Sequence, residues 1–339
     1  MKKNEIPMGY KSAMGIRKTE TAIKAIKDYF ESELARKLNL TRVSAPLFVR
    51  RDSGLNDNLN GVERPVTFDA LSLLAPTPCM LEVVQSLAKW KRQALHKYGF
   101  KSGEGLYADM NAIRRDEVLD NLHSLYVDQW DWEKVIEKEE RTVEVLKETV
   151  RSIYSAFKGT EKFVSSFFQD YDAILPEEIS FITTQDLEDM YPLLSPKERE
   201  EEIAKAKGAV FIMQIGGTLK SGIKHDGRSP DYDDWLLNGD IVFWYPVLGC
   251  ALELSSMGIR VDEEALIRQL ELSGHMDRAK LPFHQMLLTG ELPYTMGGGI
   301  GQSRICMYFL RKAHIGEVQA SVWPQDIYRE CEALGIQLL

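Results

Sequence analysis

The chain has 339 residues, of which 44% are hydrophobic and 27% are charged, and its formal net charge is −9 at pH 7. This is the composition of a globular protein with a large core, and the acidic balance argues against a broad nucleic-acid-binding surface. The four cysteines form no C-x-x-C pair and the six histidines show no metal-binding spacing, so we expect neither a disulfide framework nor a zinc site.

The sequence also bears on where the protein acts. Residues 1–14 carry lysines but lack the apolar stretch of a signal peptide, and no apolar run is long enough to span a bilayer. No internal repeat or low-complexity linker interrupts the chain. We therefore expect a cytoplasmic enzyme without a membrane partner.

The N-terminal part of the chain predicts a helix followed by a strand. Apolar residues recur at helical spacing over residues 16–38, with charged residues between them. Residues 40–49 favour a β-strand, and Pro46 confines that strand to a sheet edge or to a strand end. A long helix and an edge strand together could form a dimer interface, and an ordinary helix–strand connection is the alternative.

The sequence pattern of residues 51–61 and 80–98 does not by itself indicate a ligand-binding role. Residues 51–61 form a polar loop in which Asp57 is by default a turn residue. Residues 80–98 predict a helix. The cations of this helix are expected mainly on a solvent-facing side: Lys89, Lys91 and Arg92.

Residues 106–115 and 123–133 predict two strands joined by an acidic loop. A strand alternates its side chains between two faces, so three acceptors share one face of the second strand: Gln129, Asp131 and Glu133. If that face lay in the core it would hold costly unpaired charge, so it is either exposed to solvent or the floor of a polar pocket. We favour the pocket, and Arg114 could reach across it from the first strand.

The middle of the chain predicts two highly charged helices, over residues 132–155 and 198–207, and a short buried strand over residues 208–216. Residues 218–234 are polar and contain glycines, which is typical of a mobile loop. The aspartates of this loop are expected in solvent: Asp231, Asp233 and Asp234.

Residues 237–247 and 251–261 predict a second strand pair, with Glu253 inside an apolar strand. A buried glutamate is rarely tolerated unless it is paired or bound to a metal, and the small residues that follow leave room for a ligand. A solvent-facing glutamate on an edge strand is the alternative. Asp262 then caps a further helix, and residues 282–288 predict another.

Residues 297–301 hold four glycines, and Arg304 follows them at the start of an apolar helix pattern. The pattern predicts a glycine turn that leads into a helix start, where free N–H groups and the positive dipole end attract an anion. Arg304 can stack on a base or hold a phosphate. The run lacks the ending of a P-loop and the glycine order of a dinucleotide fold, and a flexible turn with a surface arginine is the alternative.

Together these segments favour a nucleotide site. Arginines neutralise phosphates, and Mg²⁺ takes one or two carboxylates together with phosphate oxygens, so the set suits a nucleoside triphosphate with magnesium. The short strands are typical of hairpins, which favours an α+β fold with an antiparallel sheet backed by helices. The residues concerned are Arg114, Gln129, Asp131, Glu253, Arg260 and Arg304.

Three segments carry a resemblance to a known family. Residues 123–133 (HSLYVDQWDWE), 253–260 (ELSSMGIR) and 297–304 (GGGIGQSR) resemble the ammonia-dependent asparagine synthetases of the A type, which are aspartate–ammonia ligases. Residues 86–92 (SLAKWKR) also match, and the likeness runs nearly from end to end. That family in turn resembles the catalytic domain of class II aminoacyl-tRNA synthetases.

The resemblance implies a single catalytic domain over residues 1–339, with an antiparallel sheet flanked by helices. It implies a homodimer formed through the first helix and the Pro46 strand, and no nucleic-acid partner. The implied reaction takes L-aspartate, ATP and free ammonia to L-asparagine, AMP and pyrophosphate through a β-aspartyl-AMP intermediate, with Mg²⁺ as the metal.

The resemblance also implies how ATP is held. Arg114 and Arg304 would be the arginines of the second and third class II motifs, with Arg114 on the α-phosphate and Arg304 stacked on adenine. Arg260 would bind the distal phosphates, and the glycines Gly299 and Gly301 would line the nucleotide site.

The metal and the amino acid would take a further set of side chains. Glu253 and Asp240 would bind Mg²⁺. The residues implied to hold L-aspartate are Asp57, Lys91, Gln129, Asp131 and Ser256. Lys91 suits the α-carboxylate and the acidic groups suit the α-ammonium, and Asp131 or Asp57 could take a proton from incoming ammonium.

The sequence departs from the family pattern at some positions. Gln85 stands where the family has a histidine, and the stretch over residues 72–79 is longer. Two other functions remain open. An aspartyl- or asparaginyl-tRNA synthetase would share the adenylate step but would have to bind tRNA, and a non-catalytic nucleotide-binding paralogue would be expected to lack Arg114, Glu253 or Arg304.

Overall fold

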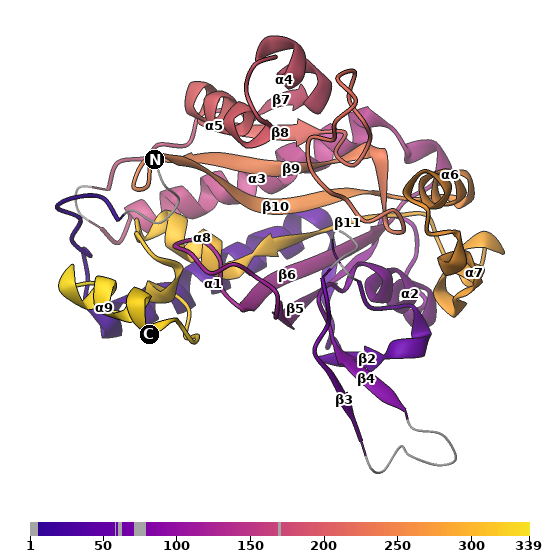
Figure 1. Ribbon diagram of the computed structural model, residues 1–339, viewed down its shortest axis with the longest axis horizontal. Coiled ribbons are helices and arrows are strands. Elements are labelled where there is room, and N and C mark those ends of the chain that lie inside the picture. Colours follow the sequence, from indigo (N-terminus) through magenta and orange to yellow (C-terminus); the bar gives the residue numbers. More distant parts are fainter. Residues whose placement is uncertain (1–5, 58, 60–62, 71–78, 169–170) are drawn as a thin grey trace.

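The computed structural model describes residues 6–57, 59, 63–70, 79–168 and 171–339. In this part of the chain, an eight-stranded sheet forms the centre of the protein (Figure 1). Its strands lie side by side in the order β1 (Leu40–Arg42), β5 (Gly105–Ile113), β6 (Tyr126–Val135), β11 (Thr295–Gly301), β10 (Cys250–Arg260), β9 (Asp233–Tyr245), β8 (Ala209–Met213) and β7 (Ser180–Thr183). The pairs at the two edges, β1–β5 and β7–β8, are parallel, and the pairs between them are antiparallel. The predicted α+β fold around a mainly antiparallel sheet is confirmed.

A smaller antiparallel sheet projects from one end of the molecule (Figure 1). Its strands are β2 (Phe48–Arg50), β4 (Met80–Val83) and β3 (Thr67–Asp69). Pro46 lies between β1 and β2, which belong to different sheets, so the single strand predicted over residues 40–49 is wrong. Proline has no N–H to donate to a strand ladder, and here the ladder stops before it.

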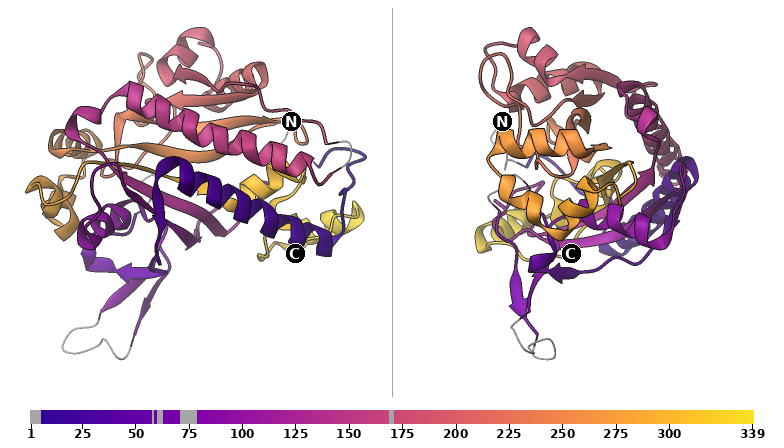
Figure 2. Two further views of the ribbon diagram at one scale, coloured as in Figure 1. Left: turned by 180° about the vertical axis from the view of Figure 1, so that it is seen from behind. Right: turned by 90° about the vertical axis from the view of Figure 1, so that its right-hand side faces the viewer.

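Two long helices cover one face of the main sheet, α1 (Ile16–Leu38) and α3 (Val143–Ser165), which pack against each other (Figure 2). The apolar stripe of α1 is buried, and Phe30 stacks on Trp130 of β6 at a centroid distance of 5.1 Å. The helix ends where Asn39 adopts a left-handed conformation. The predicted helix over residues 16–38 is therefore confirmed.

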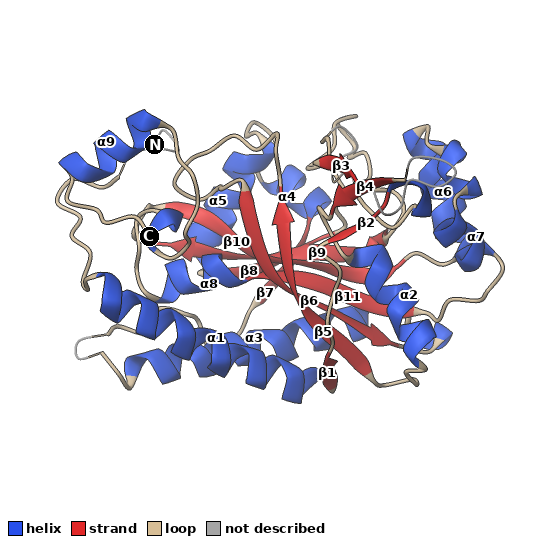
Figure 3. Cartoon of the chain, turned by 90° about the horizontal axis from the view of Figure 1, so that it is seen from below, coloured by secondary structure: helices blue, strands red, loops and turns tan. Residues whose placement is uncertain are grey.

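The other helices lie around the main sheet, and several of them pack on its strands (Figure 3). They are α2 (Ala88–Tyr98), α4 (Thr184–Met190), α5 (Pro196–Lys207), α6 (Glu263–Ser273), α7 (Pro282–Leu288), α8 (Gln302–Phe309) and α9 (Gln325–Ala333), with short 3₁₀ turns at Arg51–Ser53, Lys138–Glu140, Met276–Lys280 and Ile315–Glu317. The Ser195 and Asp262 side chains cap α5 and α6 by accepting hydrogen bonds from backbone N–H groups, as is typical of helix starts. The cap predicted at Asp262 is confirmed.

Two predicted helices begin too early. Residues 80–98 start with strand β4 and become helical only at Ala88. Residues 132–135 complete strand β6, and α3 begins at Val143, where Thr142 supplies the cap. In both cases the apolar residues of a short strand merge with the pattern of the following helix, and periodicity alone does not separate them. The strands predicted over residues 106–115, 208–216, 237–247 and 251–261 are present with shifted ends.

The glycine run forms a strand rather than a turn. Gly297, Gly298 and Gly299 lie in β11 between β6 and β10, and none of them has a positive φ. A Cβ on Gly298 would lie 2.6 Å from the Cβ of Met257 on β10, and one on Gly297 would overlap the carboxylate of Glu133. The glycines are therefore required by close approach to neighbouring strands. The helix predicted after the run is present and begins at Gln302.

Some predictions fall on parts of the chain that the structure leaves out. The stretch over residues 72–79 is described only at Cys79, and the loop over residues 51–61 is described only as far as Asp57 and at Leu59. No helix within the described residues is long and apolar enough to cross a membrane.

Candidate active site

A cavity of about 440 Å³ opens on the face of the main sheet that α1 and α3 leave uncovered. Arg114, Glu253 and Arg304, which come from three distant segments, all line it. Of the other predicted residues, the following also line this cavity: Lys91, Gln129, Asp131, Asp240, Ser256, Arg260, Gly299 and Gly301. The fold therefore brings together in one place nearly all the side chains that the sequence singled out.

Strands β6 and β11 build the floor of this cavity. Gln129 and Asp131 face it, whereas Trp130 and Trp132 point to the opposite side and are buried in the core. Gly299 pairs with Asp131, and a Cβ at Gly299 would overlap the side chain of Gln129. The glycines thus leave room beside a line of acceptors, and the pocket interpretation of this strand face agrees with the geometry.

Lys91 and Asp131 form a buried ion pair at the inner end of the cavity. Lys91 Nζ donates to Asp131 Oδ1 at 2.6 Å and to the carbonyl oxygen of Gly298 at 2.9 Å. Burial lowers the pKa of Lys91, and the neighbouring Asp131 carboxylate opposes that shift. Among the described residues, Asp131 Oδ2 is buried without a hydrogen-bond partner. An unpaired buried carboxylate oxygen is costly and is an acceptor available to a bound ammonium group.

The cations of α2 are not solvated as predicted. Lys89, Lys91 and Arg92 are all buried. Each of them has a specific acceptor. Lys89 donates to Asp231, and Lys91 donates to Asp131. Arg92 donates to the carbonyl oxygens of Pro293 and Val261. Helical periodicity does not reveal acceptors supplied by distant segments, and this is why the prediction was wrong.

Arg260 lines the cavity, but carboxylates occupy its guanidinium. It donates to Glu133 at 2.7 Å and also to Asp233, and all three side chains are buried. Burial raises the pKa of Glu133, but Arg260 outweighs that effect and holds the pKa below its usual range. Arg260 therefore connects strands β6, β10 and β9, and the predicted role on the distal phosphates would compete with these ion pairs.

Glu253 and Asp240 lie near each other beside Arg228 and Arg304. Arg228 donates to Asp240 at 2.5 Å and also to Ser256, and Arg304 donates to the backbone oxygen of Glu253 at 2.9 Å. Burial, together with the charge of Glu253, raises the pKa of Asp240 to about 6, and Arg228 opposes this shift. Two carboxylates that disfavour each other's charge in a cavity have the chemistry of a site for a divalent cation.

Glu253 and Asp240 suit Mg²⁺ better than a metal whose ligands all come from the protein. No cluster of three or more histidine, cysteine, aspartate or glutamate side chains that could hold a metal occurs in the described residues. Mg²⁺ usually keeps several waters and takes one or two carboxylates plus phosphate oxygens, so two carboxylates are sufficient when a nucleotide supplies the rest.

Asp57 lies behind the cavity rather than on its surface. The residue is 3% exposed, Asp57 Oδ1 accepts from the N–H of Leu59, and Oδ2 has no partner among the described residues. Burial raises the pKa of Asp57 to about 6, which Lys89 partly opposes. Gln85 donates to the backbone oxygen of Asp57 at 2.7 Å and lines the cavity itself.

The loop before β9 is anchored by aspartates that the sequence placed in solvent. Asp231, Asp233 and Asp234 are buried, so that prediction is wrong. Asp231 accepts from Lys89 at 3.2 Å, from Arg278 at 3.2 Å and from His284 at 2.9 Å. The carboxylate thus ties the loop to α2 and α7 and holds it where Arg228 reaches Asp240.

Sequence reasoning missed two cations of this site. Arg228 and Lys197 both line the cavity, and both come from segments that read as a polar loop and a charged surface helix. The loop sequence around Arg228 gives one usable signal, since a single arginine among several aspartates suggests ion pairing. No comparable signal exists for Lys197 among the many charges of α5.

Comparison with known proteins gives a consistent result. Residues 17–335 match the family model described as aspartate-ammonia ligase. The chain is 65% identical to the aspartate–ammonia ligase of Clostridium perfringens over 339 residues, which cover 100% of both chains. It is 66% identical to the one from Ruminiclostridium cellulolyticum, over 98% of each chain.

Solved structures with this fold include synthetases. The asparaginyl-tRNA synthetase of Pyrococcus horikoshii complexed with asparaginyl-adenylate superposes with a TM-score of 0.64 at 14% identity, over 91% of this chain and 71% of that one. The aspartyl-tRNA synthetase of Entamoeba histolytica gives a TM-score of 0.57 at 15% identity, over 89% and 58% of the two chains. At this level of identity the likeness concerns the fold, which is that of class II synthetases.

Proposed function

This chain belongs to the aspartate–ammonia ligase family, and we propose that it makes L-asparagine from L-aspartate, ammonia and ATP, with release of AMP and pyrophosphate. The observation that carries the proposal is the single cavity shared by Arg114, Glu253 and Arg304 with the buried Lys91–Asp131 pair. One end of this cavity offers cations for a nucleotide, and the other offers paired charges for an amino acid.

In the first step, the side-chain carboxylate of aspartate attacks the α-phosphorus of ATP, forms β-aspartyl-AMP and expels pyrophosphate. The physical obstacle is repulsion between a carboxylate and a polyanion. Arg114 lines the cavity with its Nε unpaired among the described residues, so it is available to an α-phosphate oxygen. Arg304 donates to a backbone oxygen and keeps a planar face for adenine. Gly301 leaves space beside Arg304, and Gly299 leaves space beside Gln129.

L-Aspartate would lie at the inner end of the cavity. Its α-ammonium can donate to Asp131 Oδ2 and Gln129, and its α-carboxylate can pair with Lys91. Ser256 would contact the same substrate, and in the absence of substrate it accepts from Arg228. This arrangement points the side-chain carboxylate of the substrate towards Arg114 and the nucleotide.

Glu253 and Asp240 would hold Mg²⁺ next to the phosphates of ATP. When bound, the ion neutralises phosphate charge and stabilises the negative charge that develops as pyrophosphate leaves. The protein's own part is to hold the two carboxylates near each other in the cavity. Arg228 keeps Asp240 in place by an ion pair, and Arg304 fixes the backbone of Glu253.

In the second step, ammonia attacks the β-carbonyl carbon of β-aspartyl-AMP, and AMP leaves with one oxygen that came from aspartate. Ammonium must first lose a proton. Asp57 lies behind the cavity lining, but its pKa suits the role, because burial raises it to about 6, and its Oδ2 has no partner among the described residues. Asp131 is the alternative acceptor, although Lys91 already holds its Oδ1.

We also propose a homodimer in the cytoplasm, with α1 and the segment around Pro46 in the interface. Leu47 and Phe48 next to Pro46 are exposed apolar side chains, at 53% and 45%, which a partner subunit would cover. Sedimentation of the purified protein tests the dimer, and a monomer at micromolar concentration would contradict it.

The activity is tested by incubating the protein with ATP, Mg²⁺, L-aspartate and ammonium in the absence of tRNA. We expect asparagine and AMP in equal amounts. A strict requirement for tRNA would favour an aspartyl- or asparaginyl-tRNA synthetase, and ADP in place of AMP would mean that attack occurs on the γ-phosphorus. Binding of ATP without any turnover would favour a non-catalytic nucleotide-binding protein.

A further inference from the structure

The cavity holds more cations than the substrate scheme above uses, and most of them are already committed. Lys91 is held by Asp131, Arg260 by Glu133 and Asp233, and Arg228 by Asp240 and Ser256. Arg114 and Arg304 are assigned to the α-phosphate and adenine. The two terminal phosphates of ATP carry the largest charge in the substrate, and apart from Mg²⁺ this scheme assigns them no cation.

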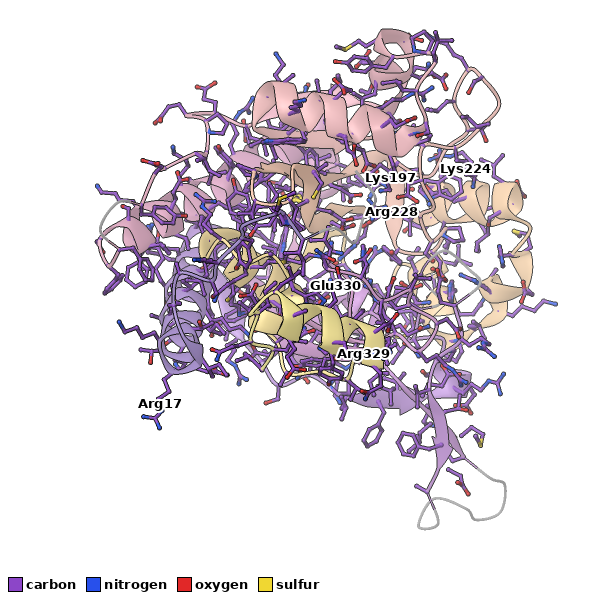
Figure 4. The ribbon with its side chains drawn as sticks, turned by 60° about the vertical axis from the view of Figure 1, so that its left-hand side comes forward. Arg17, Lys197, Lys224, Arg228, Arg329 and Glu330 are labelled. Carbon is purple, nitrogen blue, oxygen red and sulfur yellow. The ribbon has the colours of Figure 1, made fainter. Side chains whose placement is uncertain are left out.

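Lys197 is the cavity-lining cation that fits this need. It lies at the second position of α5, and its side chain is 57% exposed at the cavity mouth, whereas the side chains of Lys91 and Arg228 are nearly buried. Figure 4 shows Lys197 beside Arg228, below α5. An exposed lysine on a flexible stem can turn towards a ligand at little cost, which a buried cation cannot do.

Lys197 pairs with two carboxylates, which a phosphate can replace. Lys197 Nζ lies 2.9 Å from Glu200, one turn along α5, and 3.3 Å from Asp226 in the loop before β9. The Lys197 and Asp226 side chains are 57% and 41% exposed, and an exposed ion pair of this kind contributes little to stability. A phosphate group offers several charged oxygens at once, so it can compete with the two carboxylates for the ammonium group.

The position of Lys197 relative to Glu253 sets which part of ATP it would meet. Lys197 and Glu253 line the same cavity, and Arg304 donates to the backbone oxygen of Glu253 at 2.9 Å. Glu253 therefore shares the cavity with both cations. A magnesium ligand normally lies beside the β- and γ-phosphates, so an exposed cation that shares the cavity with Glu253 is suited to the distal end of the nucleotide.

The place of Lys197 on α5 is unfavourable for the stability of that helix. The first turn of a helix carries the positive end of the dipole, and a cation there is disfavoured. Ser195 and Glu198 provide the usual favourable groups of a helix start, and Lys197 works against them. Residues that break a local rule in this way are often retained for a functional contact.

We propose that Lys197 binds the β- and γ-phosphates of ATP, and the pyrophosphate formed from them, at the mouth of the cavity. This inference rests on the proposed function, because it assumes that ATP occupies the cavity with adenine near Arg304. It gives α5 and the segment before it a direct part in binding the leaving group.

The test measures binding rather than turnover. Calorimetric titrations in the presence of Mg²⁺ compare wild type, Lys197→Met and Lys197→Arg, with ATP, pyrophosphate and AMP as ligands. Lys197→Met should raise the Kd for ATP and for pyrophosphate by about ten- to a hundredfold, as expected for loss of one charged contact. The Kd for AMP should stay within about twofold, since AMP lacks the distal phosphates. Lys197→Arg should restore most of the affinity for ATP.

The matched control is Lys220→Met. Lys220 is also an exposed lysine in an ion pair, 2.7 Å from Asp189, but it does not line the cavity, and its loss should change no Kd. Equal weakening of ATP and AMP by Lys197→Met, or unchanged ATP binding, would overturn the inference. The proposed function fails separately, namely if the wild-type protein binds neither ATP nor AMP or forms no AMP from ATP.

Discussion

Arg260 on β10 donates to Glu133 on β6 at 2.7 Å, and this ion pair crosses the glycine strand β11 with both side chains buried. The contact is possible because Gly297 has no side chain between the two strands, where a Cβ would overlap the Glu133 carboxylate. Thr295 on β11 donates to the same carboxylate at 2.7 Å. The floor of the cavity is therefore held together by a charge network, and its failure would disturb the catalytic groups above it.

The first prediction concerns Glu133→Gln. The substitution leaves Arg260 and Lys91 with less buried negative charge, so the free energy of unfolding should fall by about 3–5 kcal/mol. Urea denaturation at pH 7 measures it. Glu33→Gln, which removes a half-buried partner of the exposed Arg36 on α1, should leave the midpoint nearly unchanged.

The loss of stability caused by Glu133→Gln should depend on pH. Although burial opposes its charge, Arg260 lowers the pKa of Glu133, so the stabilisation is present above the usual glutamate pKa and is lost as pH falls through the lowered one. The difference between wild type and Glu133→Gln should shrink at acid pH. A constant difference from neutral to acid pH would contradict the ion-pair account.

The second prediction concerns Asp57→Asn, which should stabilise the protein while reducing asparagine formation. Burial raises the pKa of Asp57 to about 6, so the folded state binds its proton more tightly than the unfolded state does. The contribution of Asp57 to the stability of wild type should therefore fall as pH rises from about 4 to about 6, by about 3 kcal/mol, and stay level above.

Asp57→Asn should not lose this stability, so the difference in the free energy of unfolding between the variant and wild type should grow through the same pH range. Chemical denaturation at a series of pH values measures the difference. Asp52→Asn, at an exposed neighbouring position paired with Arg50, is the control and should gain nothing. If Asp57→Asn is less stable than wild type at pH 7, the carboxylate is stabilised by a partner and is unsuited to accept a proton.

The third prediction concerns the nucleotide groups. Glu253→Ala and Arg304→Ala should each lower kcat/KM by on the order of 10²–10³ or more, because each removes a group positioned for charge that develops in the transition state. Circular dichroism should show an intact fold in both. Arg329→Ala, on the exposed face of α9, is the control and should keep wild-type activity. Full activity of both site variants would mean that ATP binds elsewhere.

The fourth prediction concerns the glycine strand. Gly298→Ala should lower the free energy of unfolding by about 1–3 kcal/mol, since the new Cβ would lie 2.6 Å from Met257 Cβ. Gly217→Ala is the control, because a Cβ there meets no atom within 4 Å. Thermal unfolding compares them, and equal Tm values for the two variants would show that β11 can move away from β10.

The sequence predicted the fold where patterns are long and local. The helix over residues 16–38 carries its apolar stripe through six turns, and the alternation of Trp130 and Trp132 with Gln129 and Asp131 reveals both faces of β6. Short strands next to helices, such as β4 before α2, were missed because a few apolar residues fit either period.

The candidate site could be predicted as a set of residues but not as a set of contacts. Lys89, Lys91 and Asp231 look like surface charges, because the partners that make their burial tolerable lie 40 or more positions away in the chain. The same holds for Arg260, whose guanidinium is used by Glu133 and Asp233. Pairing of buried charges is a property of the folded chain, and local patterns carry little information about it.

The central claim is that the aspartate side chain attacks the α-phosphorus of ATP inside this cavity. The most direct measurement uses aspartate labelled with ¹⁸O in both oxygens of its side-chain carboxylate, followed by mass spectrometry of the products. We predict that AMP carries one ¹⁸O atom, that asparagine keeps the other, and that pyrophosphate carries none. AMP without the label, or the label in inorganic phosphate, would contradict the account.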